Sequence, residues 1–220
     1  MRSQNSNVLL IDVDGTLVDS FPGIRESFLY SLDQVGWPRP DEERVSQIAG
    51  PPMELTLASL GMSPEQAHET LGIYLEHFGQ VGWDISSMFP GVDRALDRWR
   101  EEGFLLCTAT SKGEGFARST LQKFGLLDKF DFLGAAEERG QRRSKKAVIQ
   151  YVLDSMDLHG REDQMLLIGD RIHDVDGARA FGIETCLVGW GYGSSDERDQ
   201  ADHVARDIND LERIVDDWAN

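Results

Sequence analysis

The sequence contains little cysteine and no long apolar run. Only two of its 220 residues are cysteine, Cys107 and Cys186, and they form neither a disulfide framework nor the spacing of a metal site. No apolar stretch approaches the ~20 residues that a membrane-spanning helix needs. The polar N-terminus shows no signal-peptide pattern. We therefore expect a cytoplasmic protein that has no membrane partner.

Basic residues are also scarce. The chain has 22 Lys and Arg against 39 Asp and Glu, which gives a net charge of −17. A nucleic-acid-binding protein needs a basic patch to contact phosphates, and docking on an anionic membrane surface needs one as well. We therefore expect no nucleic-acid partner. An anionic substrate would need locally placed cations or a metal ion.

Four short apolar runs recur along the chain and have the length of buried β-strands. They are Val8–Asp12, Phe104–Thr108, Met165–Ile168 and Glu184–Val188, and the last three each follow a helical stretch. Continuous apolar runs are typical of parallel strands that are covered on both faces. The alternation of strand and helix therefore predicts an α/β fold, with a Rossmann-like parallel core sheet and helices on both faces.

The stretch from residue 20 to residue 88 differs, because it shows helical periodicity and no clear strand. Apolar residues recur there every three or four positions, at Phe21, Ile24, Phe28, Leu32 and Val35. Ser63 and Gln66 have the pattern of a helix N-cap with a capping box. A single crossover between strands needs far fewer residues. We therefore predict an inserted all-helical domain at 20–88 and a core domain formed by 1–19 and 89–220.

Two aspartates follow the first apolar run, in the segment Asp12-Val13-Asp14-Gly15-Thr16. Ligands of open α/β sheets bind at the carboxyl ends of the strands. The alternation of side chains along a strand places Asp12 and Asp14 on the same side. Two carboxylates at such a short distance repel each other unless a cation or a shared proton lies between them. The alternative interpretation is an ordinary acidic turn.

Two further polar segments are candidates for binding an anion. Thr110 and Ser111 follow the second apolar run, where hydroxyl and backbone N–H groups can hold phosphate oxygens. An ordinary helix N-cap is the alternative there. Lys145 and Lys146 belong to a basic cluster that opens a helix, where a lysine can pair with an anion facing the helix N-terminus. A solvated charged face is the alternative for this cluster.

The segment Gly169–Asp174 again places carboxylates after a strand. Asp170 and Asp174 are the candidates, although Asp174 could instead cap the following helix. We expect His173 to lie in a loop, because no serine or cysteine nucleophile pattern accompanies it. The glycine-rich segment Gly189–Gly193 lacks the pattern of a dinucleotide-binding loop, so we predict a turn-rich loop.

Together, the four segments supply two aspartates, hydroxyl groups, a lysine and two more aspartates. A metal-assisted site for a phosphoryl group explains this set, because Mg²⁺ prefers carboxylate, water and phosphate oxygens. One aspartate could attack phosphorus and form an aspartyl-phosphate. The second could protonate the leaving oxygen and later activate water. Lysine and threonine would neutralise and orient the transferring oxygens.

These motifs, taken in order, resemble those of the haloacid dehalogenase superfamily of phosphohydrolases, and the resemblance covers nearly the whole chain. It implies that Asp12 is the nucleophile. It also implies that Asp14 is the general acid/base and that its backbone carbonyl reaches Mg²⁺. Thr110 corresponds to the hydroxyl of the second motif. Lys145 corresponds to the lysine of the third motif, with Lys146 as its rival.

The same resemblance implies the metal-binding and substrate-binding sets. Asp170 and Asp174 correspond to the fourth motif and join Asp12 and Asp14 as metal ligands, with Asp170 favoured for direct coordination. The residues expected to contact the substrate are Thr110, Ser111, Lys145, Gly50 and Pro51. Gly113 stands where a proline often follows the second motif, and we attach little meaning to that difference.

The insertion at 20–88 resembles the family's helical cap, which closes over the site and supplies specificity. Ile48–Pro52 resembles the substrate-facing loop of that cap. Together with Gly189–Ser194, it makes the chain most similar to phosphoglycolate phosphatase-like members. The resemblance therefore implies a Mg²⁺-dependent phosphomonoester hydrolase, monomeric or homodimeric, that acts on a small phosphorylated metabolite. 2-Phosphoglycolate is the leading substrate.

Other functions stay open on the sequence alone. Within the family, the alternatives are a 5′-nucleotidase-type phosphatase and a β-phosphoglucomutase-like phosphotransferase. From a different class, a phosphoacceptor signalling domain also uses Asp, Thr and Lys on a parallel sheet, but it needs no large helical insertion. A non-catalytic binding protein with the same fold is a further alternative, which the presence of Asp12, Asp14, Lys145 and Asp170 disfavours.

Overall fold

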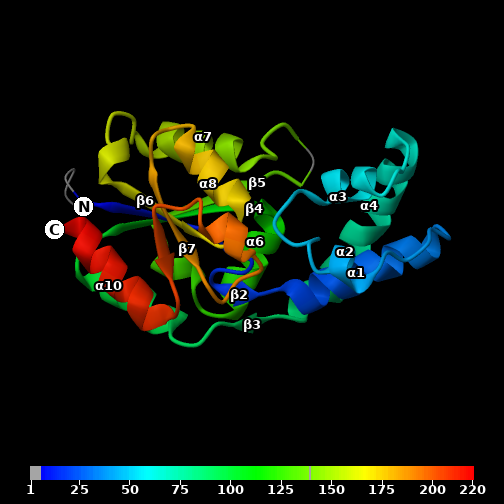
Figure 1. Cartoon of the computed structure of the whole chain (residues 1–220), viewed down its shortest axis with the longest axis horizontal. Coiled ribbons are helices and arrows are strands. Elements are labelled where there is room, and N and C mark those ends of the chain that lie inside the picture. The colour runs from blue at the N-terminus through cyan, green and yellow to red at the C-terminus, as the bar shows by residue number, and fades with distance from the viewer. Residues whose placement is uncertain (1–5, 139) are drawn as a thin grey trace.

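The computed structural model describes residues 6–138 and 140–220, so residues 1–5 of the predicted core domain lie outside the described part. Within this part, the centre is a six-stranded sheet in the order β5-β4-β1-β6-β7-β8 (Figure 1), and each neighbouring pair is parallel. The strands are β1 (Val8–Ile11), β4 (Leu105–Gly113), β5 (Phe132–Ala136), β6 (Met165–Gly169), β7 (Glu184–Val188) and β8 (His203–Ala205). The predicted fold class is therefore confirmed.

Helices cover both faces of this sheet (Figure 1). They are α5 (Val92–Glu101), α6 (Glu114–Lys123), α7 (Lys145–Met156), α8 (Ile172–Arg179), α9 (Ser195–Arg198) and α10 (Ile208–Ala219), with 3-10 turns η2 (Leu127–Lys129) and η3 (Glu162–Gln164). Val8 and Leu10 of β1 pack in one buried cluster with α7 and α8. Leu9 and Ile11 pack in another with α5 and α10. Because successive side chains point to opposite faces, β1 is apolar at every position.

The helical insertion lies between β2 (Val18–Asp19) and β3 (Ser87–Met88), which pair antiparallel. Its elements are α1 (Phe21–Gln34), α2 (Glu42–Val45), α3 (Met53–Ser59), α4 (Pro64–Gln80) and the 3-10 turn η1 (Gly82–Asp84). Their apolar side chains form a buried cluster of their own, which includes Phe28, Leu57 and Phe78. The predicted capping box at Ser63 is present at the start of α4. The domain boundaries at 20 and 88 stay a prediction.

Several elements differ from the sequence-based expectation. β2, β3, β5 and β8 were not predicted, because β2, β3 and β8 are very short and β5 is rich in small residues with weak strand preference. β4 continues to Gly113 with a register shift after Thr110, so the hydroxyl segment lies within the strand rather than after it. The placement of His173 in a loop was wrong, because α8 begins one residue earlier. In the described part of the chain, every helix is too short or too polar to span a membrane.

Candidate active site

The carboxyl ends of the central strands bring the predicted residues to one edge of the sheet. β1 lies between β4 and β6, and Ile11 is in register with Ile168. The chain passes from these two residues to Asp12 and to Asp170, and the backbone N–H of Asp12 donates to the Ile168 carbonyl at 2.9 Å. Thr110 reaches the same edge from β4. Parallel register thus collects residues that are far apart in the sequence.

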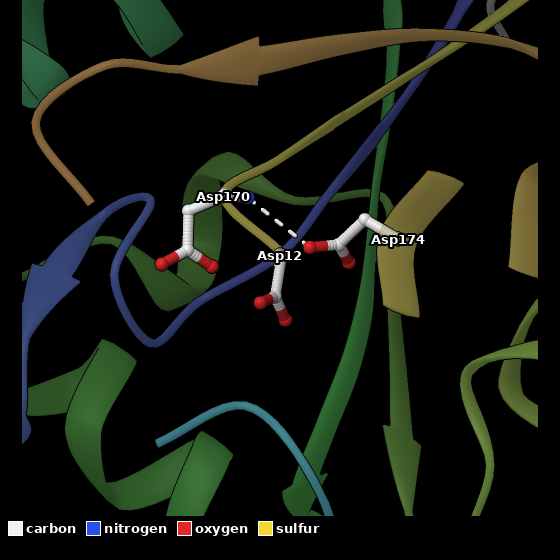
Figure 2. A group of neighbouring side chains, drawn as sticks. All are labelled: Asp12, Asp170 and Asp174. Atoms are coloured by element: carbon white, nitrogen blue, oxygen red, sulfur yellow. Dashed lines mark hydrogen bonds between the residues drawn. The ribbon is translucent and has the colours of Figure 1, made fainter. Parts of the chain in front are cut away.

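Three buried carboxylates form the centre of this edge. Asp12, Asp170 and Asp174 each offer an oxygen, and the three oxygens lie within 4.8 Å of one another (Figure 2). Asp174 Oδ2 accepts hydrogen bonds from the backbone N–H groups of Asp170 at 3.1 Å and Arg171 at 3.0 Å. Asp174 therefore caps α8 and faces the other carboxylates at once, so its two sequence interpretations do not exclude each other.

Lys145 is the cation in contact with this cluster. Its Nζ lies 2.9 Å from Asp12 Oδ1 and 2.6 Å from Asp174 Oδ1, and it donates to the Ala109 carbonyl at 2.6 Å. The Lys145 side chain is only 4% exposed, whereas its rival Lys146 is exposed to solvent. Of the two candidate lysines, the structure thus brings Lys145 to the carboxylates.

The cluster carries more negative than positive charge. With all three carboxylates ionised and Lys145 protonated, the cluster would carry a net charge of −2, and Asp170 makes no ion pair within the described residues. Burial raises the pKa of Asp12 to about 6, and nearby Asp174 adds to this while Lys145 offsets part of it. Burial and the neighbouring carboxylates also raise the pKa of Asp170. Burial alone would lower the pKa of Lys145, but Asp12 and Asp174 raise it.

A divalent cation fits this arrangement. Asp170 Oδ1 is buried and has no hydrogen-bond partner among the described residues. Asp12 Oδ1 and Asp174 Oδ1 also lack an aligned hydrogen bond, although both are within ion-pair distance of Lys145. A set of unsatisfied carboxylate oxygens with a net charge of −2 suits a hard divalent cation such as Mg²⁺.

Asp14 turns its side chain toward other partners. Lys112 Nζ lies 2.9 Å and 3.1 Å from its two carboxylate oxygens, and Ser20 Oγ donates to Oδ1 at 2.5 Å. The Asp14 carboxylate is therefore not one of the three clustered groups. The predicted metal contact through its backbone carbonyl stays a prediction. Lys112 follows Ser111 in the sequence, and its ion pair with Asp14 could not be read from the spacing.

A cavity of about 90 Å³ opens beside Asp12 and Asp14. It collects the remaining predicted substrate-binding residues, since Thr110, Ser111, Gly50 and Pro51 all contribute to its wall while Lys145 lies beneath, against Asp12. Thr110 Oγ1 also accepts from the backbone N–H of Lys112 at 3.2 Å, which orders the end of β4 that carries both side chains. A phosphoryl group in this cavity would lie between the first-motif aspartates and the hydroxyl groups.

Tyr192 is a functional candidate that sequence reasoning missed. Its backbone N–H donates to Asp170 Oδ2 at 2.7 Å, and its hydroxyl donates to Asp19 Oδ1 at 2.9 Å. The same hydroxyl accepts from two backbone N–H groups at the start of α1. Gly15, with φ +82°, and Gly191 leave room here, because a Cβ at either would collide with Asp170. An aromatic residue between two glycines after a strand was the available signal.

Two arginines join the core to the loop that precedes α3. Arg171 is buried, donates to the Ala49 carbonyl and pairs with Glu197 at 3.0 Å. Arg143 forms a two-pronged ion pair with Glu54 of α3, with both contacts at 2.7 Å. The loop before α3 and the start of that helix are therefore bound to the core by Arg171 and Arg143.

The chain belongs to the family described as haloacid dehalogenase-like hydrolase, whose model matches residues 9–188. It is similar in structure to a predicted phosphatase from Clostridium acetobutylicum, with a TM-score of 0.91, 28% identity and coverage of 96% of this chain and 99% of that one. The matched region includes all four polar segments of the carboxylate edge. Family and fold thus agree with the resemblance drawn from the motifs.

Curated relatives carry different names. The chain is 39% identical over 193 residues to "Tyrosine-protein kinase PtkA" of Mycobacterium tuberculosis, covering 88% of this chain but only 65% of that protein. It is 33% identical to a 5′-nucleotidase of Pseudomonas aeruginosa, covering 94% of each chain. It is 30% identical to a phosphoglycolate phosphatase of Cupriavidus necator, covering 84% of this chain and 81% of that protein.

Proposed function

We propose that this protein is a Mg²⁺-dependent phosphomonoesterase that forms an aspartyl-phosphate on Asp12. The observation that carries the proposal is the pairing of a cation-deficient carboxylate cluster with a cavity. Asp12 belongs to both, because one side faces Lys145 and Asp174 and the other lines the cavity. A nucleophile at this border meets phosphorus on one side and charge-stabilising groups on the other.

Each residue then has a defined task. Asp12 attacks phosphorus, while Lys145 balances charge on Asp12 and the transferring oxygens. Thr110 and Ser111 donate hydrogen bonds to those oxygens. Asp14, held by Lys112 and Ser20, protonates the leaving oxygen and later takes a proton from water.

The carboxylates of Asp12, Asp170 and Asp174 would hold the metal, with the backbone carbonyl of Asp14 as a further ligand. Bound Mg²⁺ supplies positive charge that lowers the repulsion between the phosphoryl oxygens and the carboxylates. Lys145 alone leaves two negative charges uncompensated in the cluster. Removal of the metal by a chelator should therefore abolish turnover, and added Mg²⁺ should restore it.

The substrate is a small organic phosphate. 2-Phosphoglycolate ranks first on the motif resemblance, and the phosphoglycolate phosphatase of Cupriavidus necator is among the relatives. A nucleoside 5′-monophosphate is the second candidate, because the Pseudomonas aeruginosa 5′-nucleotidase aligns over nearly the whole of both chains.

Rapid-quench mass analysis with an activated aryl phosphate tests the assignment. Asp12→Asn should give no covalent phosphoprotein. Asp14→Asn should still be phosphorylated, because an acidic leaving group needs little protonation, but the intermediate should hydrolyse slowly. Phosphorylation of Asp12→Asn at Asp14 would reverse the two roles. Absence of phosphate release from any ester in the presence of Mg²⁺ would favour a non-enzymatic protein.

A further inference from the structure

The helical insertion contributes mainly apolar side chains to the cavity lining. They come from α1, α3, α4 and the loop before α3, and they include Ile24, Ile48, Met53, Leu71, Leu75 and Phe78. The core contributes Asp12, Asp14, Thr110 and Ser111, and Lys112 of the core lies 4.8 Å from the centre of the Phe78 ring. A phosphate monoester bound with phosphorus at Asp12 would therefore direct its leaving group against hydrocarbon.

The helical insertion offers no cation to this lining. Residues 20–88 contain three basic side chains other than histidine, and all three lie elsewhere. Arg25 pairs with Glu42 at 2.7 Å, and Arg39 pairs with Asp33 at 2.5 Å. The third, Arg44, donates to the carbonyl of Ser59 and is exposed. A carboxylate on the leaving group would thus find no partner in the insertion.

The two cations that do line the cavity are already paired within the described residues. Lys112 is bound to Asp14, and Arg143 to Glu54. Burial alone would raise the pKa of Glu54, but the hydrogen bonds from Arg143 lower it, as expected for a carboxylate held by that ion pair. Glu138 adds a further acidic side chain to the lining. The lining is therefore unfavourable for a second anionic group on the substrate.

Aromatic rings shape the apolar part of the lining. The rings of Tyr74 and Phe78 are stacked at 5.7 Å, and Phe116 meets Phe78 edge-on at 5.0 Å. Tyr74 lines the cavity and is largely buried, and its hydroxyl makes no hydrogen bond to another described residue. The cavity volume of about 90 Å³ is small and favours a small leaving group.

We propose that the substrate is the phosphate ester of a small, uncharged and largely apolar alcohol, whose polarity is limited to one group that can meet the Tyr74 hydroxyl. This inference rests on the proposed function and changes the order of its substrates. The cavity lining places uncharged esters of the same size ahead of 2-phosphoglycolate, which the motif resemblance ranks first, because its carboxylate would lose hydration against apolar side chains without gaining a cation.

The test compares 2-phosphoglycolate with the phosphate ester of glycolamide, which has the same number of heavy atoms but no charge on the leaving group. kcat/KM is measured for both with Mg²⁺ and the full-length protein. We expect the glycolamide ester to be preferred by roughly tenfold or more, since an unpaired buried charge is costly. An equal or higher kcat/KM for 2-phosphoglycolate would overturn the inference.

The Leu75→Arg variant provides a second, independent test of the leaving-group inference. Leu75 lines the cavity and is only partly buried, so a guanidinium there can reach a carboxylate on the leaving group. The preference for the uncharged ester should shrink or reverse in this variant. Val81→Arg is the matched control, because Val81 follows the same helix, is 39% exposed and does not line the cavity, and the preference should stay as in the unmodified protein.

Phosphate release from 4-nitrophenyl phosphate distinguishes a failure of the leaving-group inference from a failure of the phosphatase proposal. Hydrolysis of this ester together with a preference for 2-phosphoglycolate would leave the phosphatase proposal standing and overturn the leaving-group inference. No hydrolysis of any of the three esters would overturn both. An unchanged preference in Leu75→Arg would also count against the assignment of these apolar side chains to the leaving group.

Discussion

Removal of the charge on Asp12 should stabilise the metal-free protein at neutral pH. Burial raises the pKa of this carboxyl from 3.8 to about 6, with Asp174 adding to the effect and Lys145 only partly opposing it. Between these two pH values the folded protein binds more protons than the unfolded chain. The free energy of unfolding therefore falls as pH rises through this window and stays low above it.

The magnitude follows from the shift. A difference of about two pKa units corresponds to about 3 kcal/mol at pH values above both. Asparagine resembles the protonated carboxyl, so the Asp12→Asn variant escapes this penalty. The variant's advantage in unfolding free energy over the unmodified protein should grow by about 2 kcal/mol between about pH 4 and about pH 7.5, because part of the difference is already present at pH 4.

Urea denaturation in excess chelator measures this difference at each pH. Glu69→Gln is the control, because Glu69 is an exposed residue of α4 and its replacement should change stability equally at both pH values. Added Mg²⁺ should stabilise the unmodified protein more than Asp12→Asn, since a ligand that binds only the folded state raises stability with its occupancy. An advantage that does not change with pH, or that shrinks as pH rises, would refute the reasoning.

Three further predictions follow from the geometry. Lys145→Ala should lower the rate roughly 10²-fold or more, whereas Lys146→Ala should change it little; the opposite ranking in steady-state assays would exchange their roles. Crystal structures with and without a phosphate analogue should differ mainly by a rotation of residues 20–88 about β2 and β3, and an immobile insertion would contradict this. Tyr192→Phe should lower the free energy of unfolding by about 1–2 kcal/mol in urea titrations. The Mg²⁺ affinity of the Tyr192→Phe variant, measured by calorimetry, should not change, because the backbone N–H of residue 192 and not its hydroxyl binds Asp170.

Local patterns were sufficient to predict the core strands that lead to the site. β1, β6 and β7 are continuous apolar runs, and a strand covered on both faces leaves this signature in any context. β5 and β8 carry weaker signatures, because their strand state depends on pairing with β4 and β7 rather than on their own composition. Missing them did not alter the predicted site, since both lie at the edges of the sheet.

Pairings between distant residues are harder to obtain from the sequence. Lys112 follows the second motif directly, yet nothing in its neighbourhood indicates a partner 98 positions away. The local sequence likewise does not indicate which of Lys145 and Lys146 contacts Asp12. α7 begins at Lys145, and the direction of the first helical turn decides which side chain points inward to Asp12. One residue of difference in a helix start would exchange a buried cation for a solvated one.

Arg171 lies in the fourth motif but its side chain contacts residues outside the carboxylate cluster. It follows Asp170, whose carboxylate faces the cluster, yet its own side chain extends to Ala49 and Glu197. A Cβ at Gly50 would lie 3.0 Å from Arg171 Cγ, so glycine allows the loop to approach this side chain closely. Asp170 and Arg171 are adjacent in the chain, so one short segment after β6 carries both a carboxylate of the cluster and the side chain that contacts the loop before α3.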